Sequence, residues 1–302
     1  MLPMVASADA VEINGIYYNL IKKAKVAEVT CKPNYNENEK YSGNIEIPES
    51  VTYEDETYTV AYVGKSAFLS CSQLTSVAIP ATVIYIMDYA FSGCSGLGAI
   101  TIPNSVTTIN DYAFQNCTGL TTINIPNSVS TLGKYVFQGC SNLASVFIPN
   151  SIFTIGDYSF QNCSSLTSIE IPNSVTSIGT GAFAGCTSFT AITSPDNVIK
   201  IGSGAFSDCI NLTSISLPAT LTSIEATVFQ NCSGLTSITL PNNVTYIGTS
   251  AFYKCTGLSS ISIPRGVNTI NKSAFQGCSS LISISLPDNL SEITWGAFSD
   301  CI

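Results

Sequence analysis

Apolar side chains recur along most of the chain with a strict period of 23 residues. One period, from Ala113 to Leu132, has the pattern Ala-Phe-x-x-Cys-x-x-Leu-x-x-Ile-x-Ile-Pro-x-x-Val-x-x-Leu. A fixed period between 20 and 50 residues is typical of stacked repeat architectures. Because 23 residues are too few for a helix pair or a four-stranded blade, the pattern predicts one coil of a solenoid per period.

Each period contains two short extended segments separated by turns. The first, residues 120–125 in this example, ends at Pro126, and proline has no N–H to give to a neighbouring strand. The second, residues 129–132, is apolar at both ends. The residue before the cysteine is Gly, Asn or Asp in most periods, and these residues tolerate a left-handed backbone, so we expect a tight turn there.

A single coil is not expected to fold by itself. Its inward apolar side chains bury too little surface to offset the backbone entropy that 23 residues lose on ordering. Stability must therefore come from contacts between successive coils, and equivalent side chains are expected to line up in buried columns.

The motif Leu-x-x-Ile-x-Ile-Pro-x-x-Val-x-x-Ile-Gly-x-x-Ala-Phe-x-x-Cys resembles the leucine-rich repeat of BspA-type bacterial surface proteins over residues 67–302. Segments 15–18 and 41–48 are also similar to the N-terminal region of that family. The resemblance implies a mainly β fold, a right-handed leucine-rich repeat solenoid with a parallel β-sheet. It further implies a secreted or cell-surface protein that adheres to host or neighbouring-cell proteins, and it implies no catalytic residue.

Three segments are expected along the chain. Residues 1–8 resemble the end of a secretory signal peptide, with Ala6-Ser-Ala8 as a cleavage site. Residues 9–66 are expected to form a small β-rich cap with an irregular first repeat, because they hold 16 of the 31 charged side chains. Residues 67–302 are expected to form the solenoid of about ten 23-residue units.

The cap contains two hairpin signals, and the other end of the chain has no cap. Asn14-Gly15 between two apolar segments is a strong turn signal, and residues 53–58 are also expected to form a hairpin.

The chain ends one residue after Cys301, within a repeat and without a polar cap. We therefore expect that the natural chain continues or that a partner covers the last coil.

Charge and composition exclude several functional classes. The net charge is −9, which argues against a nucleic-acid or anionic-membrane surface. The chain has no histidine, so Ser-His-Asp and Cys-His catalysis and imidazole zinc ligands are excluded. No apolar stretch is long enough to span a membrane. We expect no enzymatic activity and no cofactor.

Eleven of the twelve cysteines share the 23-residue period, and three roles are open to them. Disulfides are disfavoured because stacked side chains lie about 4.8 Å apart, whereas a disulfide requires Cβ atoms about 3.8 Å apart. A metal site is disfavoured because zinc ligands usually lie two to four residues apart. We favour buried small apolar side chains for a ladder of Cys71, Cys94, Cys117, Cys140, Cys163, Cys186, Cys209, Cys232, Cys255, Cys278 and Cys301.

One group of candidate ligand-binding residues lies in the first extended segments. The position between the last two inward apolar residues is small in most periods, but in three successive periods it is Asn124, Phe147 and Glu170. An outward Phe beside a carboxylate suggests a contact patch for a protein ligand. The alternative is sequence drift on a tolerant surface.

A second group consists of four tyrosines in consecutive periods, which precede the small residue of the Ala-Phe pair. They are Tyr89, Tyr112, Tyr135 and Tyr158. At about 4.8 Å spacing they would form a ladder that stacks on sugar rings or peptide side chains. The alternative is aromatic packing between neighbouring coils that stabilises the structure.

One period departs from the motif. Phe189 replaces the inward leucine, and Ser194 occupies the inward isoleucine position before Pro195. A buried hydroxyl without a partner costs about 1–3 kcal/mol. We expect local loosening or a bend in this coil.

These features favour a non-catalytic extracellular module that binds proteins through a long, uncharged, hydroxyl-rich face. A second hypothesis is a glycan-binding module that uses the tyrosine ladder. A third is a spacer for a C-terminal domain outside this sequence.

Overall fold

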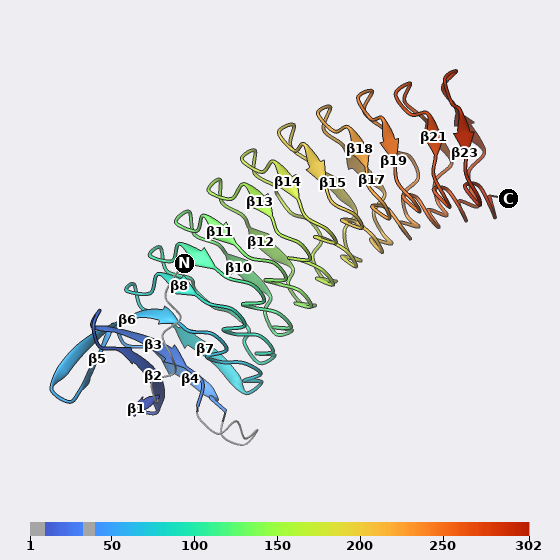
Figure 1. The fold of residues 1–302 in the computed structure, drawn as a ribbon. Coiled ribbons are helices and arrows are strands. Elements are labelled where there is room, and N and C mark those ends of the chain that lie inside the picture. The colour runs from blue at the N-terminus through green and yellow to red at the C-terminus, as the bar shows by residue number, and fades with distance from the viewer. Residues whose placement is uncertain (1–9, 33–39, 302) are drawn as a thin grey trace. The chain divides into compact units, whose positions relative to one another are not determined.

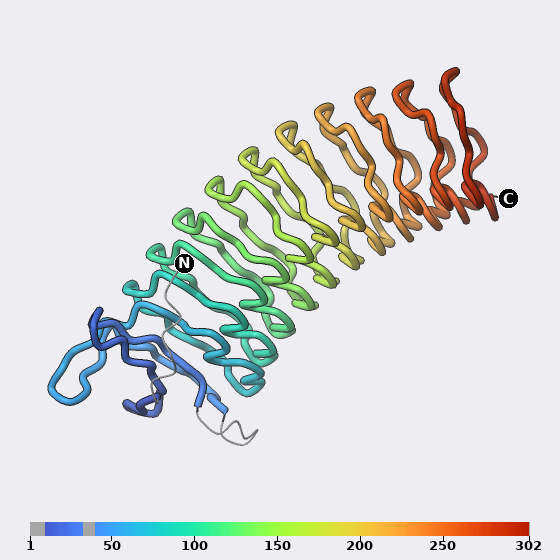
Figure 2. The backbone as a smooth tube through the Cα atoms, in the orientation of Figure 1, coloured from blue at the N-terminus to red at the C-terminus, as the bar shows by residue number. Residues whose placement is uncertain are grey.

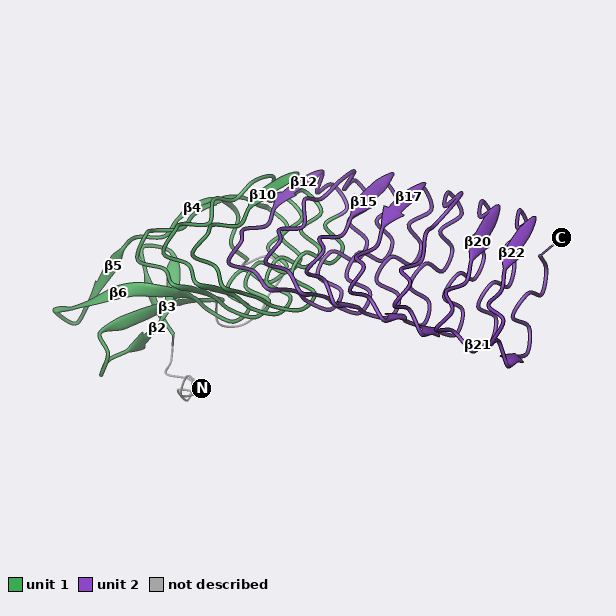
Figure 3. Ribbon diagram, turned by 90° about the horizontal axis from the view of Figure 1, so that it is seen from above, with its two compact units in different colours: residues 1–140 green, residues 141–302 purple. Residues whose placement is uncertain are grey.

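The computed structural model describes residues 10–32 and 40–301. Within these residues the chain forms strands and turns and no helix. It divides into two compact units, residues 1–140 and 141–302 (Figure 3). In each unit, successive 23-residue repeats form successive coils of a parallel β-solenoid, which confirms the predicted fold class (Figures 1 and 2).

The strands are short and follow one another at the period of the sequence. Unit 1–140 contains β1 (Val11–Ile13), β2 (Ile16–Ile21), β3 (Val26–Thr30), β4 (Gly43–Glu46), β5 (Ser50–Tyr53), β6 (Glu56–Val63), β7 (Leu74–Ala78), β8 (Tyr85–Ile86), β9 (Thr108–Ile109), β10 (Thr122–Asn124) and β11 (Thr131–Leu132). Unit 141–302 contains β12 (Ser145–Phe147), β13 (Thr154–Ile155), β14 (Ser177–Ile178), β15 (Ala191–Thr193), β16 (Lys200–Ile201), β17 (Ser214–Ser216), β18 (Ser223–Ile224), β19 (Tyr246–Ile247), β20 (Ser260–Ser262), β21 (Thr269–Ile270), β22 (Ser283–Ser285) and β23 (Glu292–Ile293).

The two extended segments of each coil pair with their equivalents one coil away. In unit 141–302 the first segments pair β15 with β17 and β20 with β22, in parallel and in register. The second segments form the parallel sheet β13-β14-β16 and the pairs β18-β19 and β21-β23. In unit 1–140 the second segments β6, β8, β9 and β11 also pair in parallel. The strand pairing of the repeats therefore runs between successive coils, as expected for a stacked array.

The strands are shorter than the extended segments expected from the sequence, because turns close inside them. The amide of Leu120 donates to the carbonyl oxygen of Cys117 at 3.0 Å, so β10 begins only at Thr122. The amide of Val129 donates to the carbonyl oxygen of Pro126 at 3.0 Å, so β11 begins only at Thr131.

The N-terminal part of unit 1–140 contains both predicted hairpins. β1 and β2 pair antiparallel around Asn14-Gly15, and both turn residues have a positive φ. β5 and β6 pair antiparallel around Glu54-Asp55. β3 then pairs in parallel with β6, which joins these strands to the second segments of the coils. The predicted signal-peptide end, residues 1–8, lies outside the described residues.

Phenylalanine columns fill the core of each unit, as predicted from the repeat. Phe68, Phe91, Phe114 and Phe137 stack at centroid distances of 5.1, 5.2 and 5.6 Å. From Phe160 to Phe298 in the other unit the equivalent distances run from 5.2 to 6.0 Å. Aligned columns of this kind require coils of uniform length.

The turn before each cysteine has a left-handed residue in every period from Ser70 to Asp300. Nine of these residues are Gly, Asn or Asp, which confirms the turn expected from the sequence; the other two are Ser70 and Lys254.

The coil that departs from the motif keeps its path but contains an unpartnered hydroxyl. Phe189 is fully buried and packs at a tilt against Phe183, with ring centroids 5.7 Å apart. Ser194 is 4% exposed, and its Oγ has no hydrogen-bond partner among the described residues. The expected loosening of this coil remains a prediction.

No helix in the described part of the chain is long and apolar enough to cross a membrane.

Candidate functional site

The outward positions of the first segments form a solvent-exposed row in each unit. This placement follows from alternation along an extended segment, because the flanking residues, which are apolar in most coils, point into the core. The side chains are small apart from the three singled out in the sequence. The exposed row is Ala78, Thr101 and Asn124 in the first unit, and Phe147, Glu170, Thr193, Ser216, Thr239, Ser262 and Ser285 in the second.

Phe147 and Glu170 line one hollow in unit 141–302. The hollow lies where the first segments of two successive coils turn at their prolines, and the corner asparagines Asn150 and Asn173 complete its polar lining. Phe147 is 54% exposed, so more than half of an aromatic side chain faces solvent. The structure thus brings together two of the three residues of the expected contact patch. Asn124 is exposed at the end of β10 in the other unit.

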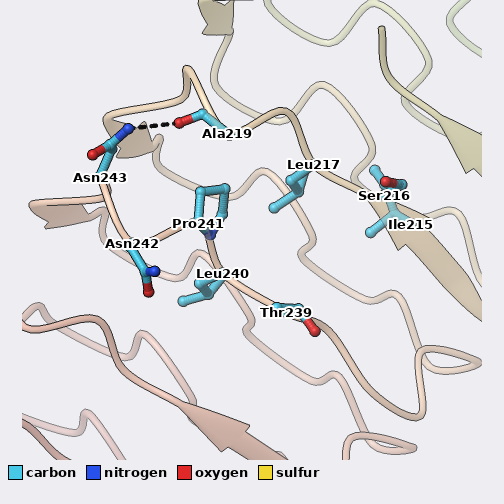
Figure 4. Close-up of a pocket in the computed structure, with 9 residues that line it drawn as sticks. All are labelled: Ile215, Ser216, Leu217, Ala219, Thr239, Leu240, Pro241, Asn242 and Asn243. Carbon is cyan, nitrogen blue, oxygen red and sulfur yellow. Dashed lines mark hydrogen bonds between the residues drawn. The ribbon is translucent and has the colours of Figure 1, made fainter. Parts of the chain in front are cut away.

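Similar hollows occur at other proline corners of the same unit. One adjoins the first and shares Glu170 and Asn173 with it, and its far side is formed by Thr193 and Pro195. Another lies between Ser216 and Thr239, where Asn243 Nδ2 donates to the carbonyl oxygen of Ala219 at 2.8 Å (Figure 4). The corner between coils is therefore a repeated shallow site, and its chemistry varies with the outward residue.

Glu170 is the only formal charge in the lining of its hollow. Ion pairs join Lys22 to Glu54 and Lys25 to Glu56 in the N-terminal unit. The Glu170 carboxylate is exposed and has no such partner within residues 10–32 and 40–301. It is free to pair with an external cation.

Tyr89, Tyr112 and Tyr135 form a stack in unit 1–140. The ring centroids of Tyr89 and Tyr112 are 4.6 Å apart, those of Tyr112 and Tyr135 are 4.5 Å apart, and the rings are nearly parallel. Both faces of Tyr112 are therefore covered by neighbours. Desolvation and the neighbouring Tyr135 and Tyr89 phenols raise the pKa of Tyr112. The side chains are only partly buried, and they offer edges and hydroxyls to a ligand.

All four tyrosines have a left-handed backbone, with φ between 56° and 60°. Such a conformation is uncommon for a bulky residue, and the sequence-based prediction missed it. The signal was Gly181, Gly204 and Gly296 at the same position of later repeats, all with positive φ. A Cβ atom on Gly181 would lie 2.4 Å from Tyr158 Cε1, so the Tyr158 ring lies over this glycine.

The cysteines of the repeat are thiols whose hydrogen-bond partners were not foreseen. In unit 1–140 the Sγ atoms of Cys94, Cys117 and Cys140 donate to the carbonyl oxygen of the phenylalanine 26 residues earlier, at 3.0 to 3.1 Å. In the other unit Cys186, Cys209, Cys232, Cys255, Cys278 and Cys301 do the same at 3.0 to 3.2 Å.

Burial raises the pKa of the repeat thiols from Cys71 to Cys140 and from Cys186 to Cys301, and makes them poor nucleophiles. The pKa values of Cys140, Cys209 and Cys278 rise to about 12 because these thiols are desolvated. The described residues contain no group of three or more His, Cys, Asp or Glu side chains that could hold a metal ion. The repeat thiols therefore lie within the fold as hydrogen-bond donors, whereas the hollow at Phe147 and Glu170 is exposed to solvent.

The sequence-based prediction missed several surface residues. Asn150 and Asn173 line the hollow, and the recurrence of Asn after the repeat prolines was the available signal. Phe153 and Ile199 are 61% and 63% exposed and occupy equivalent positions two coils apart. Each stands where most other repeats have Thr, Ser or Asn, and this contrast marks them as exceptions.

Residues 61–190 and 176–302 match the family model described as the BspA type leucine rich repeat region. No protein among the curated sequences matches the chain.

Several solved structures are similar to this chain. A leucine-rich cell surface protein from Faecalibacterium prausnitzii is 30% identical with a TM-score of 0.73, and the match covers 98% of this chain and 87% of that one. A leucine-rich repeat protein from Bacteroides ovatus is 29% identical with a TM-score of 0.51, and the match covers 97% and 92% of the two chains. The pneumococcal vaccine antigen PcpA is 19% identical over 94% of this chain and 86% of its own, with a TM-score of 0.55, and shares the fold.

Proposed function

The chain belongs to the BspA-type leucine-rich repeat family, and on this basis we propose that it is a protein-binding module of a bacterial cell surface. Repeat proteins of this kind are generally non-enzymatic, and the family model that matches the chain is one of them. Their extended, regular surfaces suit recognition of other proteins through many separate contacts.

The observation that supports protein binding most directly is the hollow at Phe147 and Glu170. Aromatic residues are enriched where protein surfaces meet, and an exposed ring beside a recess can anchor a partner. The neighbouring hollows at Thr193 and at Ser216 and Thr239 extend the same kind of surface along unit 141–302. Around Phe147 the exposed row consists mostly of small, hydroxyl-bearing side chains, which can donate and accept hydrogen bonds.

The proposed surface location is supported by one relative. The Faecalibacterium prausnitzii protein is described as a cell surface protein, and it covers nearly the whole of this chain at 30% identity. We therefore propose that this chain also acts outside the cell and contacts proteins of a host or of neighbouring cells.

Glycan binding is the second candidate, and the tyrosine stack is the observation that favours it. Tyrosine contacts sugars through its ring face and its hydroxyl. In the stack of Tyr89, Tyr112 and Tyr135 the faces of the middle ring are covered, so a sugar would meet ring edges and hydroxyls. Protein binding is therefore the stronger proposal.

One pair of measurements separates these candidates. The purified chain is tested by biolayer interferometry against a panel of purified extracellular proteins and is also applied to a glycan array. We expect saturable binding to at least one protein, weakened by Phe147→Ala, and no glycan signal. A glycan signal that disappears in a variant with all four tyrosines replaced, without any protein ligand, would favour the second candidate. No binding signal in either assay would contradict a binding role and would favour the hypothesis that the chain is a spacer.

A further inference from the structure

The hollow at Phe147 and Glu170 combines an aromatic surface with an unpaired negative charge. Phe147 closes β12, and Glu170 occupies the equivalent position one coil later. Its lining contains no lysine or arginine, and its other polar side chains are the neutral amides of Asn150 and Asn173. From these features we infer that the hollow binds a cationic side chain, arginine above all, from a basic segment of a protein partner. This inference rests on the proposed function.

Arginine matches both parts of the hollow. Its guanidinium pairs with a carboxylate through two parallel hydrogen bonds and stacks on an aromatic face. Its alkyl stem packs on apolar surface, which Ile148, Ile171 and Pro172 contribute to the lining. Lysine satisfies the charge but lacks the planar, bidentate group, so we expect it to bind more weakly.

The surrounding charge favours the same occupant. Residues 141–302 carry eight acidic and four basic side chains. Asp196 is exposed and directly follows Pro195, which lines the adjoining hollow. An acidic partner would face repulsion from Glu170, whereas a basic segment gains attraction along this part of the unit.

The chain offers matched controls for both residues within the same unit. Phe153 is another exposed phenylalanine, 61% exposed, and it does not line the hollow. Glu292 is another exposed glutamate; it lies on β23, far from Glu170 in the sequence. Glu170→Gln and Glu292→Gln change the net charge equally, so a general charge effect would act on both variants.

The experiment is an NMR titration of the full ¹⁵N-labelled chain with the peptide acetyl-Gly-Arg-Gly-Arg-Gly-amide. A peptide with citrulline in place of arginine has a similar shape and no positive charge. We expect the arginine peptide to shift the amides of residues 146–148, 150, 170, 171 and 173, and the citrulline peptide to leave them unchanged. Glu170→Gln and Phe147→Ala should each raise the dissociation constant by about threefold or more. Glu292→Gln and Phe153→Ala should leave it within about twofold.

Equal binding of the citrulline peptide, equal effects of Glu170→Gln and Glu292→Gln, or no shifts in the hollow would each overturn the inference. These outcomes are separate from failure of the proposed function. A protein ligand that binds Glu170→Gln as well as the unchanged chain leaves protein binding standing and removes the cationic contact. If the panel yields no protein ligand, the proposed function fails, while the peptide titration still decides what the hollow binds.

Discussion

The thiol of Cys232 donates to the carbonyl oxygen of Phe206 at 3.1 Å, and the same carbonyl accepts the amide of Cys209 at 3.4 Å. One buried oxygen therefore joins the turn of its own coil to the cysteine of the next. The relationship recurs at the repeat interval in both units. It explains why a residue with both an apolar surface and a weak donor suits this position.

Cys232→Ala should destabilise the chain by about 1–3 kcal/mol, because it removes a donor from a buried carbonyl and leaves a small void. Cys232→Ser keeps a donor and should cost less. Urea unfolding followed by circular dichroism measures both. Cys301→Ala, at a partly exposed thiol, is the control and should have a smaller effect than Cys232→Ala. Equal losses for the Ser and Ala variants at position 232 would show that the hydrogen bond contributes nothing.

The free energy of unfolding should fall as the pH rises above about 9. Burial raises the pKa values of Cys140, Cys209 and Cys278 from 9.0 to about 12. Between these pH values the folded chain keeps protons that the unfolded chain releases, so alkali favours unfolding. Each such thiol contributes a slope of about 1.4 kcal/mol per pH unit. Below pH 9 both states hold the protons and this contribution is constant.

Urea midpoints at pH 7, 8.5, 10 and 10.5 test this expectation. Cys209→Ser removes one titrating group and should make the alkaline slope shallower. A midpoint that stays constant from pH 7 to 10.5 would contradict the raised pKa values.

Ser194→Ala should stabilise the chain by about 1 kcal/mol, because it removes a buried hydroxyl that has no partner among the described residues. Ser216→Ala removes an exposed hydroxyl and is the control, with a change near zero expected. Chemical denaturation measures both variants.

Native-state hydrogen exchange tests the same coil without mutation. Residues 186–206 should exchange faster than the flanking coils, because the unpaired hydroxyl weakens the local packing. Greater protection in this segment than in its neighbours would refute the expected loosening.

Tyr112→Ala should destabilise the chain by about 1–3 kcal/mol through loss of aromatic stacking on both faces. Tyr112→Gly loses the same stacking but removes the backbone strain of a left-handed φ of 60°. It should therefore lower the free energy of unfolding less than the Ala variant does. Urea unfolding ranks the two. Ser250 has φ of 56° at the equivalent position, so Ser250→Gly and Ser250→Ala measure the backbone effect without the stack. A Gly variant less stable than the Ala variant at position 112 would contradict this account.

The sequence predicted the coil, its two extended segments and its turns because each depends on local features. Pro126 ends a strand wherever it stands in the fold, and Gly93 before Cys94 permits a left-handed turn by itself. The strand lengths were less accurate. The turns closed by Leu120 and Val129 shorten both segments, and such hydrogen bonds are not evident from hydrophobic pattern.

The candidate site was predictable only in part. Phe147 and Glu170 attracted attention because they differ from the small residues at equivalent positions of other repeats. Whether Asn150 and Asn173 line the hollow depends on how the proline corners of two successive coils are placed relative to each other. No single repeat contains that information. The thiol hydrogen bonds were missed for the same reason, since each joins residues 26 positions apart in different coils.

The sequence by itself determined the repeat length, the inward and outward positions and the absence of histidine chemistry, since these follow from residue identity and period. Only the tertiary structure decided what neighbouring coils do to one another. It aligned the rings of Tyr89, Tyr112 and Tyr135 so that their faces cover each other, and it placed Phe147 and Glu170 on one hollow. The physical reason is that these contacts depend on the spacing and angle between coils, which the summed packing of many buried side chains sets.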